Sequence, residues 1–152
     1  MSVTYPLGVQ TFQKLVESNL LYIDKTAEIY PLVKRGGYYF YSRPRRFGKS
    51  LMLSTIKAIF EGKKDLFKGL WIEDQWDWSK KHPVIHLSFS SINYQNKPQE
   101  KAIADRLETI ALENEIILDG TFAKDRIREL IIAFAENENK LVFEYDESKY
   151  GI

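Results

Sequence analysis

Residues 37–50 read Gly-Tyr-Tyr-Phe-Tyr-Ser-Arg-Pro-Arg-Arg-Phe-Gly-Lys-Ser, and this stretch decides the expected fold. Its aromatic run, Tyr38 to Tyr41, predicts a short and largely buried strand. A basic loop follows the run, and the apolar residues after Gly-Lys-Ser predict the start of a helix. A strand, an anion-binding loop and a helix in this order are typical of a phosphate-binding P-loop.

The loop departs at one position from the phosphate-binding pattern G-x-x-x-x-G-K-[ST]. Arg43 stands where the first glycine usually permits a turn that a side chain hinders, and Pro44 removes one backbone donor. In such a loop, Lys49 reaches the β- and γ-phosphates and the Ser50 hydroxyl binds Mg²⁺. The alternative is a solvated basic turn before a chance Gly-Lys-Ser. The flanking strand and helix favour phosphate binding over that alternative.

The composition is that of an ordinary globular protein. The 152 residues are 44% hydrophobic and 28% charged, which suits one domain with a real core. A formal net charge of +1 gives no general attraction to nucleic acid or membranes, so any basic patch is local. The absence of cysteine excludes disulfides and thiolate metal sites. Neither a membrane-spanning run nor a signal peptide is visible, so we expect a cytoplasmic protein.

Hydrophobic spacing predicts the other elements along the chain. The three tryptophans, all within residues 63–83, are expected to fill the core of an irregular segment. Strands separated by helices predict an α/β domain with a mainly parallel sheet. Right-handed crossovers would then place the loop at Gly48 and the acids after Val142 at one edge of the sheet. Helices are expected at residues 12–17, 26–35, 51–61, 98–117 and 122–136, and strands at residues 84–90 and 140–146.

Four segments occur in this order: Tyr5-Pro6-Leu7-Gly8, Tyr22-Ile23-Asp24-Lys25-Thr26, residues 42–51 and Pro83-Val84-Ile85-His86-Leu87-Ser88-Phe89-Ser90. Taken together, they resemble the bacterial predicted AAA-ATPase (AAA-ATPase-like) domains. In that family Ser-Arg-Pro-Arg-Arg-Phe-Gly-Lys-Ser is the usual P-loop, so Arg43 in place of glycine follows the family pattern. The resemblance implies a P-loop NTPase-like three-layer sandwich with a mainly parallel sheet. It also implies that residues 1–152 form a single, incomplete domain, the N-terminal part of a larger ATPase.

The resemblance further implies ATP and Mg²⁺ as cofactors, and a C-terminal nuclease-like domain in full-length relatives. Phe143 stands where the family has the aspartate that organises Mg²⁺, while Glu144 remains where the catalytic acid is expected. Ser50 and the displaced Asp146 are then the expected metal ligands. The expected nucleotide-binding residues are Arg43, Arg45, Arg46, Phe47, Gly48, Lys49, Ser50 and Leu51.

Two functions follow from these residues. The first is an ATP-binding domain whose hydrolysis is weak or lost, because Phe143 removes one part of the hydrolytic site. The alternative is a non-catalytic module or inactive remnant, whose arginine-rich loop binds an acidic partner or a nucleic-acid backbone. Asp24 and Lys25 also leave two interpretations open. They could contact the nucleotide, or form a capped turn with a local ion pair.

Overall fold

The structure is a computed structural model, and it divides the chain into two compact units, Met1–Lys81 and His82–Ile152. The expectation of one incomplete domain over residues 1–152 stays a prediction. The residues described are 5, 6, 8, 9, 11–42, 44, 47–88, 98–136 and 142–146.

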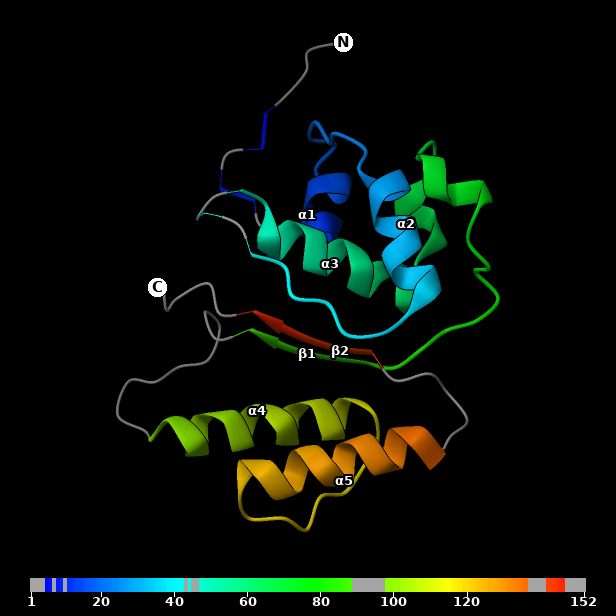
Figure 1. Cartoon of the computed structure of the whole chain (residues 1–152). Coiled ribbons are helices and arrows are strands. Elements are labelled where there is room, and N and C mark those ends of the chain that lie inside the picture. Colours follow the sequence, from blue (N-terminus) through cyan, green and yellow to red (C-terminus); the bar gives the residue numbers. More distant parts are fainter. Residues whose placement is uncertain are drawn as a thin grey trace. The chain divides into compact units, whose positions relative to one another are not determined.

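The first unit is helical. Three α-helices, α1 (Phe12–Glu17), α2 (Thr26–Arg35) and α3 (Lys49–Phe60), are followed by two short 3₁₀ helices, η1 (Lys64–Phe67) and η2 (Trp71–Asp74). Figure 1 shows α1, α2 and α3 grouped in this unit. The buried side chains of these five helices form the core of the unit, because each α-helix presents its apolar stripe to the others. These side chains are Phe12, Leu15, Ile29, Val33, Ala58, Ile59, Phe60, Phe67 and Ile72.

Aromatic contacts connect the irregular segment after α3 to this core. The ring of Trp78 lies 5.0 Å from that of Phe67, and the ring of Trp76 lies 5.7 Å from that of Phe60. Both tryptophans therefore pack as the sequence predicts. Trp71 is 46% exposed, although its ring contacts Tyr30 at 5.4 Å.

The described residues of the second unit form two strands and two helices. Strand β1 (Val84–Ser88) pairs in parallel with β2 (Val142–Asp146), so that Val84 lies opposite Val142 and Ser88 opposite Asp146. In the sequence, α4 (Gln99–Glu113) and α5 (Ala123–Glu136) come between the two strands. The two helices lie side by side along one face of the strand pair (Figure 1). The core forms between β1 and these two helices. It comprises Ile85, Leu87, Ala102, Leu107, Ile110, Ala111, Leu118, Leu130 and Phe134.

The expected three-layer sandwich with a mainly parallel sheet is wrong for the part of the chain that the structure describes. That part is mostly helical, and its sheet has two strands, both in the second unit. The predicted strand at residues 38–41 does not form, so it cannot bring the Gly48 loop to a shared sheet edge. The physical reason lies in packing. Aromatic residues favour strands where a sheet surface buries them, and here their rings are exposed.

The predictions for the individual helices and the other strands are confirmed more closely. Residues 84–88 and 142–146 are strands within the predicted ranges, and α2 continues through Pro31 over the predicted residues. Residues 89–90 and 140–141 lie outside the described residues. Among the described helices, none is long and apolar enough to cross a membrane.

Candidate functional site

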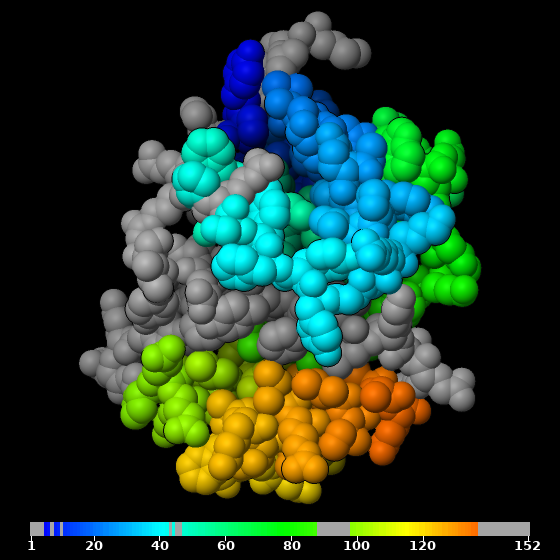
Figure 2. All heavy atoms as spheres, viewed as in Figure 1, coloured from blue at the N-terminus to red at the C-terminus, as the bar shows by residue number. Residues whose placement is uncertain are grey.

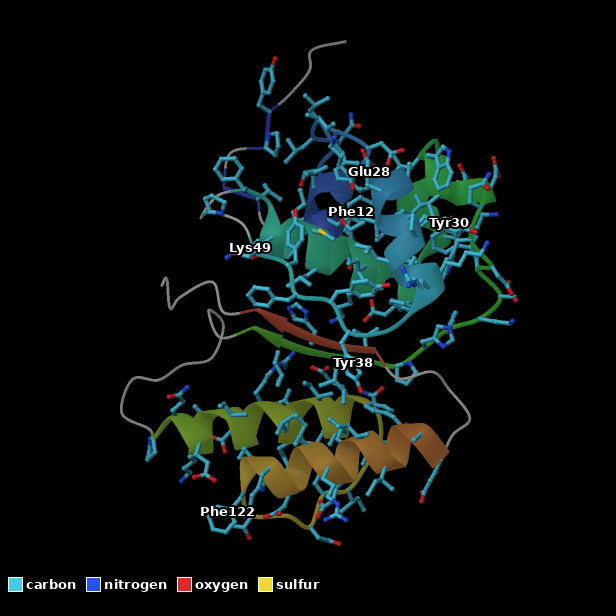
Figure 3. The ribbon with its side chains drawn as sticks, viewed as in Figure 1. Phe12, Glu28, Tyr30, Tyr38, Lys49 and Phe122 are labelled. Atoms are coloured by element: carbon cyan, nitrogen blue, oxygen red, sulfur yellow. The ribbon has the colours of Figure 1, made fainter. Side chains whose placement is uncertain are left out.

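The candidate phosphate site is the start of α3. Gly48 is the N-cap residue, and its left-handed backbone (φ 74°, ψ 22°) turns the chain into the helix. Glycine suits this position because it has no Cβ to oppose a positive φ. Lys49 and Ser50 are the first two helical residues, and Figure 3 shows Lys49 at this end of α3. The predicted order of glycine, lysine, serine and helix is therefore present.

The helical hydrogen-bond ladder of α3 starts with the Met52 N–H, which donates to the Gly48 carbonyl at 2.9 Å. The first amides of a helix precede this ladder. Together with the helix dipole, equivalent to about half a positive charge, they favour an anion.

Side-chain hydrogen bonds fix the first two turns of α3. The Leu51 carbonyl accepts from the Ser54 hydroxyl and the Thr55 hydroxyl, each at 2.8 Å. The Ser54 oxygen in turn accepts the Phe12 N–H at 2.9 Å, which joins α1 to α3. Because Phe12 and Thr55 are fully buried, the start of α3 is held firmly against the core of the first unit.

Asp24 organises the start of α2. Its Oδ1 accepts from the Thr26 N–H at 2.8 Å and the Thr26 hydroxyl at 2.7 Å, and its Oδ2 accepts from the Trp71 N–H at 2.8 Å. Burial alone would raise the pKa of the Asp24 carboxyl, but these hydrogen bonds outweigh it and lower that pKa. Lys25 forms an exposed ion pair with Glu28 at 3.7 Å. The structure thus supports the capped turn for Asp24 and Lys25.

Tyr22 lies near Asp24 in sequence and has a perturbed hydroxyl. Burial raises its pKa, a hydrogen bond with Thr55 opposes that shift, and the negative charge of Asp24 adds to it. The ring of Tyr22 also packs edge-on against Phe12, 5.0 Å away. These contacts are explained by the packing of the first unit.

The structure places only some of the predicted site residues together. Phe47, Gly48, Lys49, Ser50 and Leu51 follow one another into α3, and Phe47 is 60% exposed. The remaining predicted residues of the loop, Arg43, Arg45 and Arg46, lie outside the described residues.

The predicted acids belong to the other unit. On β2, Glu144 lies opposite His86 and Asp146 opposite Ser88. Their side chains lie outside the description, so the roles of Glu144 and Asp146 stay predictions. Among the described residues, no group of three or more His, Asp or Glu side chains could hold a metal ion.

A groove in the first unit escaped sequence reasoning. Its volume is about 340 Å³, and it lies beside α1 and α3. At its rim, Glu61 pairs with Lys63 at 2.8 Å and with Lys57 at 3.6 Å. Lys63 also donates to the Gln13 side chain at 3.3 Å, across 50 residues of sequence. No sequence pattern signals such a groove, because its walls come from distant segments.

A family model shows which family the chain belongs to. The chain belongs to the family described as "Predicted AAA-ATPase", whose model matches residues 6–148. A relative from Azotobacter chroococcum mcd 1, described as an uncharacterized protein in the vnfD 5′ region, is 51% identical over 85 residues. The match covers 55% of this chain and 16% of that protein, so the chain spans a small part of its relative. No solved structure matches the chain.

Proposed function

We propose that this chain binds ATP at the start of α3 and hydrolyses it slowly or not at all. The observation that carries the proposal is the left-handed Gly48 followed by Lys49 and Ser50 at the head of a 12-residue helix. Membership of the AAA-ATPase-like family supports a nucleotide as the anion. The expected fold is not needed for this proposal, because an anion binds to local backbone amides and a lysine.

Lys49 provides the charge that a triphosphate requires. It follows the N-cap glycine directly, so its ammonium group and the helix amides act on the same region. Arg43, Arg45 and Arg46 precede it in the sequence and add three positive charges to the loop. Each guanidinium group can donate hydrogen bonds to two phosphate oxygens at once, so three arginines favour a polyphosphate over a single small anion.

Mg²⁺ would bind at this site together with the triphosphate. It usually takes one or two protein oxygens and fills its other positions with phosphate oxygens and water. Ser50 would supply a hydroxyl ligand, and the ion would neutralise phosphate charge.

Weak hydrolysis follows from Phe143. A phenylalanine side chain has no oxygen to orient water bound to a metal ion, so that step of phosphoryl transfer lacks its usual carboxylate. Glu144 is the remaining carboxylate that we propose as the catalytic base. A cytoplasmic location is proposed with this function.

The test is binding of a fluorescent ATP analogue with and without Mg²⁺. We expect magnesium-dependent binding, weakened at least about tenfold by Lys49→Ala, which corresponds to about 1.4 kcal/mol. Lys57→Ala in the same helix is the matched control and should change affinity less than about twofold. Equal loss in both variants, or no binding by the intact chain at millimolar analogue, would refute the proposal. A phosphate-release rate of about 1 per second or faster would refute slow hydrolysis.

A further inference from the structure

The aromatic segment, defined as residues 38–41, is the most unusual surface of the first unit. Tyr38 is 106% exposed and Phe40 95%, whereas Tyr39 is 52% and Tyr41 38% exposed. Large aromatic side chains are normally buried, because each can remove 150–250 Å² of surface from water. Figure 2 shows this cyan part of the chain at the surface. Four consecutive exposed rings therefore require an explanation.

The exposure alternates along the segment. In an extended backbone, side chains two residues apart share a face and lie about 6.6–6.8 Å apart along the chain. Tyr38 and Phe40 would thus present two rings on one face. Tyr39 instead folds back, since its hydroxyl donates to the Gly36 carbonyl at 2.9 Å. Tyr39, which lies between the two outward rings in the sequence, is thus held by a hydrogen bond to the backbone.

Positively charged residues flank these rings in the sequence. Residues 34–49 include six of the chain's 22 basic residues and no acidic residue. The rest of the chain then has 16 basic and 21 acidic residues, a formal charge of −5. The modest overall charge of +1 therefore conceals a local cationic stretch in an otherwise acidic protein. Lys34 and Arg35, both exposed, close α2 directly before the aromatic segment.

The apolar side chains of this stretch also have one chemical character. Between Gly36 and Gly48 there is no aliphatic residue other than Pro44, so every large apolar group is a ring. Protein-binding surfaces are also enriched in aromatic side chains and arginine, but charged residues are depleted from their buried centres. A stretch that combines rings with cations matches a single-stranded nucleic acid, whose bases stack on rings while its phosphates pair with cations.

We propose that the aromatic segment, with Lys34 and Arg35 before it and Phe47 and Lys49 after it, binds single-stranded nucleic acid. Tyr38 and Phe40 stack on successive bases, and the basic side chains contact the phosphates. The binding is independent of base sequence, since every base offers a flat face. This proposal does not depend on ATP binding at α3, because the two rings precede that helix.

The experiment is fluorescence anisotropy of a labelled oligo(dT) of about 20 nucleotides, long enough for one binding site. The double variant Tyr38→Ala/Phe40→Ala should weaken binding at least about tenfold, because each stacked base contributes on the order of a several-fold gain in affinity. Tyr5→Ala is the matched control, since Tyr5 is 70% exposed but lies outside the segment. Its affinity should stay within about twofold of the intact chain.

Salt dependence tests the phosphate contacts separately. Arg35→Gln should lower the slope of log affinity against log salt concentration by about 0.7, the value for one phosphate contact on a single strand. Thermal unfolding of the double variant should match that of the intact chain, because the two rings are exposed. That measurement excludes loss of binding through misfolding.

Four outcomes would overturn the proposal. They are no binding by the intact chain, an unchanged affinity in the double variant, an equal loss in Tyr5→Ala, and equal affinity for polyglutamate of the same charge. The last would indicate an acidic protein as partner instead. The double variant Tyr38→Ala/Phe40→Ala distinguishes the two proposals, because it should weaken oligonucleotide binding while leaving affinity for the ATP analogue within about twofold of the intact chain. If ATP binding fails and oligonucleotide binding remains, only the proposed function is refuted.

Discussion

Asp24→Ala should destabilise the first unit more than any other single change at its surface. The carboxylate accepts three hydrogen bonds, two from Thr26 and one from the Trp71 N–H. It thereby joins the start of α2 to η2. Thr26 extends this connection into the core, because its fully buried hydroxyl oxygen accepts the Ile72 N–H at 3.2 Å.

The magnitude follows from these bonds. A hydrogen bond to a charged group contributes about 1.5–3 kcal/mol when it is shielded from water. Asp24 is exposed, so water competes, and the loss of a helix cap, about 0.5–2 kcal/mol, is the better scale. With the additional bond to Trp71, we expect a loss of about 2 kcal/mol in the free energy of unfolding. Asp24→Asn keeps one oxygen for Thr26 and should lose about half as much.

Urea denaturation followed by tryptophan fluorescence measures this directly. All three tryptophans, Trp71, Trp76 and Trp78, lie in the first unit, so the signal reports on that unit alone. Asp74→Ala is the matched control. It removes the same charge from η2 at an exposed side chain, and a change below about 0.5 kcal/mol is expected.

The pH dependence provides an independent check. The pKa of Asp24 is lower in the folded chain than in the unfolded chain, so its contribution is present above the unfolded pKa of about 3.9. That contribution is lost as the pH falls through the folded pKa. The difference between the intact chain and Asp24→Ala should therefore be constant near neutral pH and shrink below about pH 4. A difference under about 0.5 kcal/mol at neutral pH, or one that grows on acidification, would refute the reasoning.

Three further changes test the second unit and the candidate site. Leu107→Ala empties a fully buried position and should lower the free energy of unfolding by about 2–5 kcal/mol. Leu112→Ala in the same helix, at 66% exposure, should lower it by under about 0.5 kcal/mol, and urea unfolding followed by circular dichroism measures both. Arg126→Ala removes hydrogen bonds to two backbone carbonyls and an ion pair, so it should cost about 2 kcal/mol in the same assay, with the exposed Arg128→Ala nearly neutral. Gly48→Ala meets no neighbouring atom but forces a side chain to a φ of 74°, so it should cost about 1–2 kcal/mol and weaken binding of the ATP analogue.

Helix ends show what the sequence could predict. After α1 and α3, the chain turns at Asn19 (φ 49°) and Gly62 (φ 70°), and a following N–H reaches back to a carbonyl of the last turn. Asparagine and glycine are the residues that tolerate such a conformation, so both ends were predictable. The same turn after α4 uses Glu115 (φ 59°), and the Ile116 N–H donates to Ala111 at 2.9 Å. Glutamate is no signal for this turn, so the predicted helix over 98–117 runs past the observed end.

The candidate site was predictable only as local sequence. Gly48, Lys49 and Ser50 form a pattern within three residues, and the structure shows the glycine turn and the helix that the pattern requires. The hydrogen bonds that hold that helix join Phe12 to Ser54, across 42 residues. The bond from Trp71 to Asp24 likewise spans 47 residues. Such pairs depend on how helices pack, and no local pattern encodes them.

The strand that was predicted at residues 38–41 but does not form connects the fold to the two proposals. A sequence that folds well satisfies each local preference, and exceptions are expected where function requires them. Tyr38 and Phe40 have strong strand preference, yet they form no strand in the described chain and expose nearly their whole surface. Such rings favour aggregation unless something limits their contact with other chains. The six positive charges that flank these rings in the sequence repel a second copy and attract an anion, so the same residues that discourage self-association favour a phosphate-bearing partner.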